Sequence, residues 1–197
     1  AFSVLLFHPS SPAHAALGGD FARRSAMGLA MGGTAVAIIY SPWGQRSGAH
    51  INPSATLAFL QLGKVGTADA VFYVAAQFAG ALLGVAISSL ALGEALTHPS
   101  INFAATLPGA TGPLVAFTAE AAISFLLMST ILVVSTSPLH RWTGLCAALL
   151  VAAYIVLEAP LSGMSMNPAR SLGSNLFAGA LRPLWIYFVA PPLGMQL

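Results

Sequence analysis

The sequence predicts an all-α membrane protein that combines membrane-spanning helices with short re-entrant half-helices. Of its 197 residues, 57% are hydrophobic and only 6% are charged, whereas soluble domains carry about 25% charged residues. A soluble fold of this length cannot cover its surface with so few charges, so several membrane spans are expected. The second observation is a pair of dipeptides, Asn52-Pro53 and Asn167-Pro168, each followed by an apolar run too short to cross a bilayer.

Each Asn-Pro dipeptide predicts the start of a helix, because Asn is a good N-cap and Pro is favoured at the first helical position. Both follow a Ser-Gly pair at the same spacing, Ser47-Gly48 in one case and Ser162-Gly163 in the other. Two helices of about 10 residues, at about 1.5 Å per residue, together cover about 30 Å, the thickness of the hydrocarbon core. We therefore expect two half-helices that enter from opposite sides and meet at the midplane, an arrangement that indicates a transport site.

Longer apolar runs predict complete membrane spans at about residues 24–40, 69–92, 114–135 and 142–157. The apolar stretches 1–7 and 183–197 are too short to cross, and we expect them to be parts of a first and a last helix cut by the ends of the chain. The order is then three spans and one half-helix, repeated. Because three is odd, the second copy inserts upside down. We expect a single transmembrane channel domain over residues 1–197, with an inverted repeat of halves 1–92 and 114–197 joined by loop 93–113.

Small and polar residues within the spans carry further expectations. Small residues four apart permit close helix contact, which we expect at Gly28 and Gly32 and again at Ala76, Gly80 and Gly84. Segment 41–46 is expected to be a turn. Two polar residues need an explanation: Gln77 requires a hydrogen-bonding partner inside its span, and Glu158 is expected at the membrane interface, with a place in the pore as the alternative.

The two Asn-Pro segments resemble those of aquaporins, of the major intrinsic protein family. The residues that carry the resemblance are Ser-Gly-Ala-His-Ile-Asn-Pro-Ser at 47–54, Asn-Pro-Ala-Arg-Ser at 167–171, the stretches 76–80 and 185–191, and Glu120. The resemblance covers essentially the whole chain and implies six transmembrane helices plus two re-entrant half-helices. It also implies the two pore motifs, which here are Asn52, Pro53 and Ser54, and Asn167, Pro168 and Ala169. Ser54 replaces the usual Ala, and because both are small we expect the cap to survive.

The resemblance also implies a selectivity filter. Arg170 corresponds to the filter arginine, and an arginine among apolar residues of a membrane protein marks a functional site by default. By spacing from Arg170, Met164 matches the filter loop, and Ile155 matches a fifth-helix position that is histidine in many strict water channels. Without that histidine the constriction should be wider and more apolar. Met31 is the expected second-helix member, with Met27 and Gly32 as alternatives.

Two further residues are expected to support the loops before the half-helices. By resemblance, Glu120 accepts hydrogen bonds from the re-entrant loop of its own half. His50 is expected to form hydrogen bonds that pack the first loop or line the pore. No other histidine, cysteine or carboxylate stands near His50 in the sequence, so no metal site is expected, and no cofactor is expected either.

These features predict a passive channel that conducts water while excluding ions and protons, and whose filter admits small uncharged solutes. Each half-helix N-terminus carries about half a positive elementary charge, and the free amide N–H groups of Asn52 and Asn167 can donate to water. By resemblance, Ser171 and Tyr187-Phe188 favour water over glycerol, whereas Asn175 does not. Two alternatives stay open: a glycerol or polyol facilitator, and a poorly conducting structural membrane protein. An enzyme is disfavoured because the spans contain no cluster of acid, base or nucleophile.

The expected surroundings are a lipid bilayer and, by resemblance, three further copies of the chain in a homotetramer with one pore per subunit. The short extramembrane segments fit a bacterial inner membrane. A net charge of +2 with scattered basic residues excludes a nucleic-acid partner.

Overall fold

The computed structural model describes all residues 1–197 and consists of helices and the turns that join them. Three helices are long and apolar enough to cross a membrane: Thr67–Leu92, Pro113–Ser135 and His140–Leu157. The all-α membrane fold expected from composition is thereby confirmed. The elements are α1 (Phe2–Phe7), α2 (Pro12–Ala16), α3 (Asp20–Ile39), α4 (Pro42–Ser47), α5 (Pro53–Gln61), α6 (Thr67–Leu92), α7 (Glu94–Thr97), a 3-10 turn at Asn102–Ala104, α8 (Pro113–Ser135), a 3-10 turn at His140–Trp142, α9 (Thr143–Leu157), α10 (Ala159–Ser162), α11 (Pro168–Phe177) and α12 (Leu184–Gln196).

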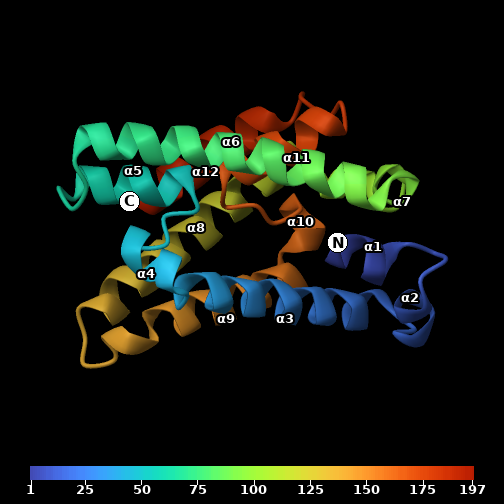
Figure 1. Ribbon diagram of the computed structural model, residues 1–197, viewed down its shortest axis with the longest axis horizontal. Coiled ribbons are helices and arrows are strands. Elements are labelled where there is room, and N and C mark those ends of the chain that lie inside the picture. Colours follow the sequence, from blue (N-terminus) through green and yellow to red (C-terminus); the bar gives the residue numbers. More distant parts are fainter.

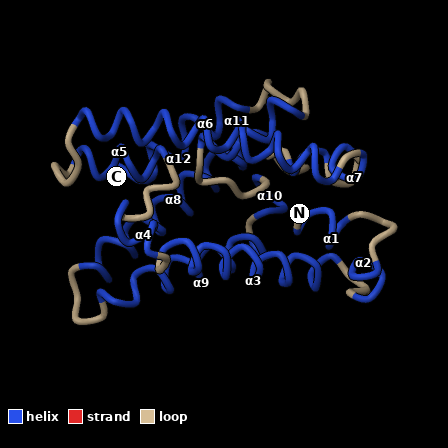
Figure 2. The backbone as a smooth tube through the Cα atoms, in the orientation of Figure 1, coloured by secondary structure: helices blue, strands red, loops and turns tan.

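The long helices form one bundle. α3 packs along α9, α8 packs along α12, and α6 packs against both α5 and α11. In Figure 1, α3 and α9 lie along one side of the molecule, while α5, α6 and α11 lie along the opposite side. Figure 2 shows two loop segments in the middle of the molecule, one leading into α5 and the other running from α10 towards α11. The two short helices therefore begin at mid-depth of the bundle.

The contact between α3 and α9 depends on two glycines, as the sequence predicts. A Cβ atom on Gly28 would lie 2.6 Å from the carbonyl oxygen of Ala152, and one on Gly32 would lie 3.0 Å from that of Ala148. A Cβ atom 2.6 Å from a carbonyl oxygen would clash, and one at 3.0 Å would require the neighbouring backbone to shift, so glycine at these positions permits the close approach.

The second expected close contact is wrong. A Cβ atom on Gly80 or Gly84 would meet nothing within 4 Å, and both residues are exposed. No element of the chain covers this face of α6. Within residues 1–197 the two glycines meet no other helix, and they line a cavity.

The connections differ from the expected plain turns. Segment 41–46 belongs to a short helix, α4, because the Ser41 hydroxyl caps it by accepting from the Gly44 amide at 3.0 Å. Loop 93–113 contains α7 and three consecutive non-glycine residues in the left-handed region, Asn102, Phe103 and Ala104, with φ of +42°, +53° and +53°. Such residues cost about 1–2 kcal/mol each, so their surroundings must hold this turn in place.

Glu158 does not lie at an exposed interface, contrary to expectation. It follows the last residue of α9 and is only 6% exposed. Neither carboxylate oxygen has a hydrogen-bond partner. This burial arises in the folded chain, and local sequence does not reveal it.

Candidate functional site

Both Asn-Pro dipeptides cap a helix as predicted. The Asn52 Oδ1 atom accepts from the Ser54 amide at 2.9 Å. The Asn167 Oδ1 atom accepts from the amides of Ala169 and Arg170 at 3.0 and 3.2 Å. Both asparagines have the extended backbone that an N-cap requires, each with a φ of −144°. The serine at position 54 leaves this geometry intact.

The two caps also bind each other's loop. The Asn52 Nδ2 atom donates to the Met166 carbonyl at 2.7 Å, and the Asn167 Nδ2 atom donates to the Ile51 carbonyl at 2.8 Å. Each asparagine thus bonds the residue that precedes the other. The N-termini of α5 and α11 consequently lie next to each other in the middle of the bundle. An amide Nδ2 carries two hydrogens, so this arrangement uses one per asparagine and leaves one, where the sequence had suggested that both were free.

Glu120 holds the loop that leads into α11. It is fully buried in α8. Its Oε1 accepts from the Ser162 hydroxyl and the Ser165 amide, and its Oε2 accepts from the Met166 amide, each at 2.7 Å. The loop needs such support, because Met164 and Met166 lie in the left-handed region with φ of +48° and +53°. Backbone strain of this kind persists only where the surroundings over-determine it.

Gln77 and His50 support the loop that leads into α5. The Gln77 Nε2 atom donates to the His50 carbonyl at 2.6 Å and to the Thr56 hydroxyl at 3.0 Å, which supplies the partner that an amide in a span requires. The His50 ring lies between the rings of Phe59 and Tyr73, with centroids 5.1 and 4.9 Å away, and its Nδ1 atom is 3.4 Å from the Thr56 hydroxyl oxygen.

A pair of tyrosines secures both loops in the same way, and sequence reasoning missed it. The Tyr73 hydroxyl donates to the Ser47 carbonyl at 2.9 Å, and the Tyr187 hydroxyl donates to the Ser162 carbonyl at 2.5 Å. These serines are the ones that open the two matching Ser-Gly pairs. The available signal was positional, since each tyrosine stands seven residues before a glycine in its helix.

A cavity of about 550 Å³ opens beside the paired asparagines. Its lining includes His50, Asn167 and Arg170 together with the uncovered glycines of α6, and Arg170 is the one Lys, Arg, Asp or Glu among its lining residues. The Arg170 Nη1 atom is buried and has no hydrogen-bond partner in the protein. A guanidinium group has five N–H donors. At least one donor here thus remains without a partner in the protein.

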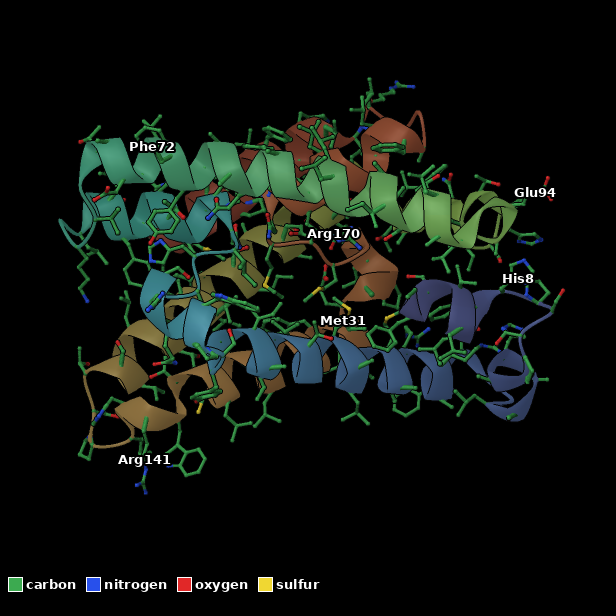
Figure 3. All side chains as sticks on the ribbon, viewed as in Figure 1. His8, Met31, Phe72, Glu94, Arg141 and Arg170 are labelled. Atoms are coloured by element: carbon green, nitrogen blue, oxygen red, sulfur yellow. The ribbon has the colours of Figure 1, made fainter.

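None of the three second-helix candidates for the filter lines the cavity beside Arg170. Gly32 is buried against α9. Met31 is 40% exposed and lies on the side of α3 that faces Arg170 (Figure 3). Met27 lies one turn before Met31 on the same helix and is partly buried.

The remaining two filter candidates belong to the packed interior. The Met164 side chain is 8% exposed and lies in the core cluster, and Ile155 packs against that cluster. The Ser162 hydroxyl accepts from the Met164 amide at 3.0 Å, which fixes the backbone of the loop there. The Met164 side chain therefore does not line the cavity beside Arg170.

Comparisons with known proteins agree with this geometry. The family model described as major intrinsic protein matches residues 5–197. A glycerol uptake facilitator protein-like 6 of Lactiplantibacillus plantarum is 36% identical over 181 residues, covering 87% of this chain and 81% of the relative. Aquaporin NIP1-1 of Oryza sativa subsp. japonica is 39% identical over 166 residues, covering 82% of this chain and 56% of the relative. The chain thus spans little more than half of the plant protein.

The fold has a counterpart among solved structures. The X-ray structure of the aquaglyceroporin from Plasmodium falciparum superimposes with a TM-score of 0.76 and covers 99% of this chain and 84% of that one. Identity in this comparison is 19%, so the likeness concerns the aquaporin-like fold alone.

Proposed function

Because the chain belongs to the major intrinsic protein family, we propose that it forms a passive transmembrane channel for water and small uncharged solutes. Proteins of this family are membrane channels and not enzymes. The observation that carries the proposal is the reciprocal bond of each asparagine to the opposite loop. It brings two helix N-termini face to face at mid-depth, beside a cavity that contains Arg170.

This arrangement supports the exclusion of ions and protons. Two helix N-termini present about half a positive charge each to the same point, and the guanidinium of Arg170 adds a full charge at the cavity wall. A cation meets positive potential at both places. The second Nδ2 hydrogen of Asn52 and of Asn167 can donate to a single water. Such a water presents its oxygen to both amides and is poorly placed to pass a proton along.

The filter proposed here consists of Arg170, Ile155, Met31 and the backbone of Met164. Two of the four positions, Ile155 and Met31, offer apolar side chains, the third offers the backbone of Met164, and no histidine narrows the passage. A donor at one wall and apolar side chains at two others suit a small alcohol or amide, which has polar and apolar sides. A glycerol or polyol facilitator is therefore the second candidate, supported by the similarity to a glycerol uptake facilitator-like protein.

Three further proposals concern organisation. The matched Ser-Gly loops, caps and tyrosines support an inverted repeat of residues 1–92 and 114–197 within one channel domain. Large apolar side chains on the outside of α6, such as Leu90 at 88% exposure and Phe72 at 75%, suit contact with lipid or with other copies in a homotetramer. A bacterial inner membrane is the proposed location.

Stopped-flow light scattering on proteoliposomes of the full-length protein tests the function. Shrinkage in an impermeant osmolyte measures water flow, and re-swelling in glycerol or urea measures solute flow. We expect water permeability above that of protein-free liposomes, with measurable solute re-swelling. Solute flow with negligible water flow would favour the facilitator, and the absence of both would refute a channel.

A further inference from the structure

A segment of the connection between α6 and α8 is fastened across the second half-helix. We call residues 105–109 the strap. The Thr106 amide donates to the Asn175 Oδ1 atom at 2.8 Å, and the Asn175 Nδ2 atom donates back to the Thr106 carbonyl at 2.9 Å. The same Nδ2 atom donates to the Ala180 carbonyl at 2.9 Å. Asn175 and Thr106 are both fully buried. The Asn175 side-chain amide pairs with the backbone N–H and C=O of Thr106, as a neighbouring β-strand would.

The strap also touches the loop that carries the filter position. The Gly109 amide donates to the Leu161 carbonyl at 2.8 Å. A Cβ atom on Gly109 would lie 1.9 Å from the Pro160 carbonyl oxygen, and one on Gly163 would lie 2.9 Å from the Leu107 carbonyl oxygen. Glycine at these positions lets the two chains approach to backbone contact. The strap and the filter loop are therefore in direct backbone contact.

A line of buried hydroxyl groups continues from the strap to the centre. The Thr106 Oγ1 atom is 3.2 Å from the Ser171 Oγ atom, which is 2.6 Å from the Ser165 Oγ atom. The Ser165 hydroxyl then donates to the Asn167 carbonyl at 2.9 Å and accepts from the Asn167 amide at 3.2 Å. All three hydroxyl side chains are buried, where hydrogen bonds gain strength and a missing partner is costly.

We propose that the strap positions Asn167, and that Asn175, Thr106, Ser171 and Ser165 are positioning residues that set solute selectivity from outside the pore. None of Thr106, Ser171, Ser165 and Asn175 lines the cavity beside Arg170. The proposal rests on the proposed channel function. It also gives Asn175 a role that its sequence position did not suggest. The Asn175 side-chain amide forms its hydrogen bonds with Thr106 and Ala180.

The primary test variant is Thr106→Val, which removes one hydroxyl and leaves the two backbone bonds to Asn175. Asn175→Ala is less suitable, because it removes the partner of two buried backbone groups of Thr106 and of the half-buried Ala180 carbonyl. The matched control is Thr118→Val on α8, where the exposed hydroxyl bonds only carbonyls of its own helix. In proteoliposomes we expect Thr106→Val to raise the ratio of glycerol to water permeability roughly threefold, the effect of losing one neutral hydrogen bond. The control should leave the ratio unchanged.

A second variant tests whether the three hydroxyl groups act together. Ser165→Ala removes the hydroxyl that contacts Asn167. If the hydroxyls act together, the double variant with Thr106→Val should change the ratio of glycerol to water permeability no more than the larger single variant does. Independent sites would instead multiply their effects, and that result would overturn the proposal. If the wild-type protein conducts, an unchanged ratio of glycerol to water permeability in Thr106→Val would also overturn the proposal.

Hydrogen exchange supplies a readout that does not need conduction. The amide of Asn167 should exchange faster in Thr106→Val than in Thr118→Val, because the Ser165 hydroxyl that accepts from it has lost its support. Unaltered exchange across residues 162–171 would overturn the proposal even if the wild-type protein proved not to conduct. Absent flux in the wild type with faster exchange in the variant would refute the channel and retain the strap.

Discussion

Replacing Glu120 by glutamine should weaken the hydrogen bonds that hold the filter loop, while the side chain at position 120 keeps nearly the same size. Two of the three hydrogen bonds to this carboxylate come from backbone amides, those of Ser165 and Met166, and the third comes from the Ser162 hydroxyl. A glutamine has only one acceptor oxygen. Its best placement keeps the two bonds now made to Oε1, and its NH₂ group then faces the Met166 amide, donor against donor.

The cost follows from these contacts. Losing one bond to a charged acceptor removes about 1.5–3 kcal/mol, and turning the two others from charged to neutral bonds removes about 1 kcal/mol each. The free energy of unfolding should therefore fall by about 3–5 kcal/mol, values typical of a broken buried network. Because Met164 and Met166 are held in the left-handed region, part of this loss should appear as local relaxation of the loop.

Equilibrium unfolding in mixed detergent micelles, followed by circular dichroism, measures the stability change, and stopped-flow light scattering measures water permeability. Glu94→Gln is the matched control, since Glu94 is exposed on α7 and its change should stay within about 0.5 kcal/mol. We expect Glu120→Gln to lose both stability and water permeability. A Glu120→Gln protein within about 1 kcal/mol of wild type, with unchanged permeability, would refute the reasoning, because three charge-assisted bonds should be worth more than that.

Three other changes have defined outcomes. Arg170→Ala should widen the filter and admit cations or protons, measured as a pH-dye signal or a conductance in proteoliposomes; unchanged exclusion would remove Arg170 from its proposed role. Ile155→His should narrow the filter and lower the ratio of glycerol to water permeability, and a raised ratio would contradict the assignment of Ile155. Gly28→Ala places a carbon 2.6 Å from the Ala152 carbonyl and should cost about 1–3 kcal/mol of unfolding free energy through overpacking. Gly33→Ala, with nothing within 4 Å, is its control, and equal stability of the two would show that α3 and α9 do not depend on close approach.

The sequence indicated the helices and caps because both depend on local chemistry. Hydropathy over some twenty residues identifies a span, and an Asn-Pro dipeptide identifies a helix start. Residues 69–92 and 114–135 accordingly match α6 and α8 closely, with observed bounds of Thr67–Leu92 and Pro113–Ser135. The expected bond from Glu120 to the filter loop came from family resemblance, since 42 to 46 residues separate the partners.

The predictions that proved wrong concern residues whose surroundings are set by helices other than their own. Glycines four apart indicate a close contact only if some helix covers them, and α9 covers Gly28 while nothing covers Gly80. Glu158 at a helix end looked like an interface residue, but it is only 6% exposed in the folded chain. Neither outcome can be predicted from composition or spacing.

By itself, then, the sequence determined that this chain is a helical membrane protein with two short capped helices, because apolar length and N-cap chemistry act within a few residues. Only the tertiary structure decided that each asparagine bonds the opposite loop and that Asn175 fastens a strap 69 residues away. Hydrogen bonds between such distant residues depend on how whole helices pack, and that packing is a property of the entire chain.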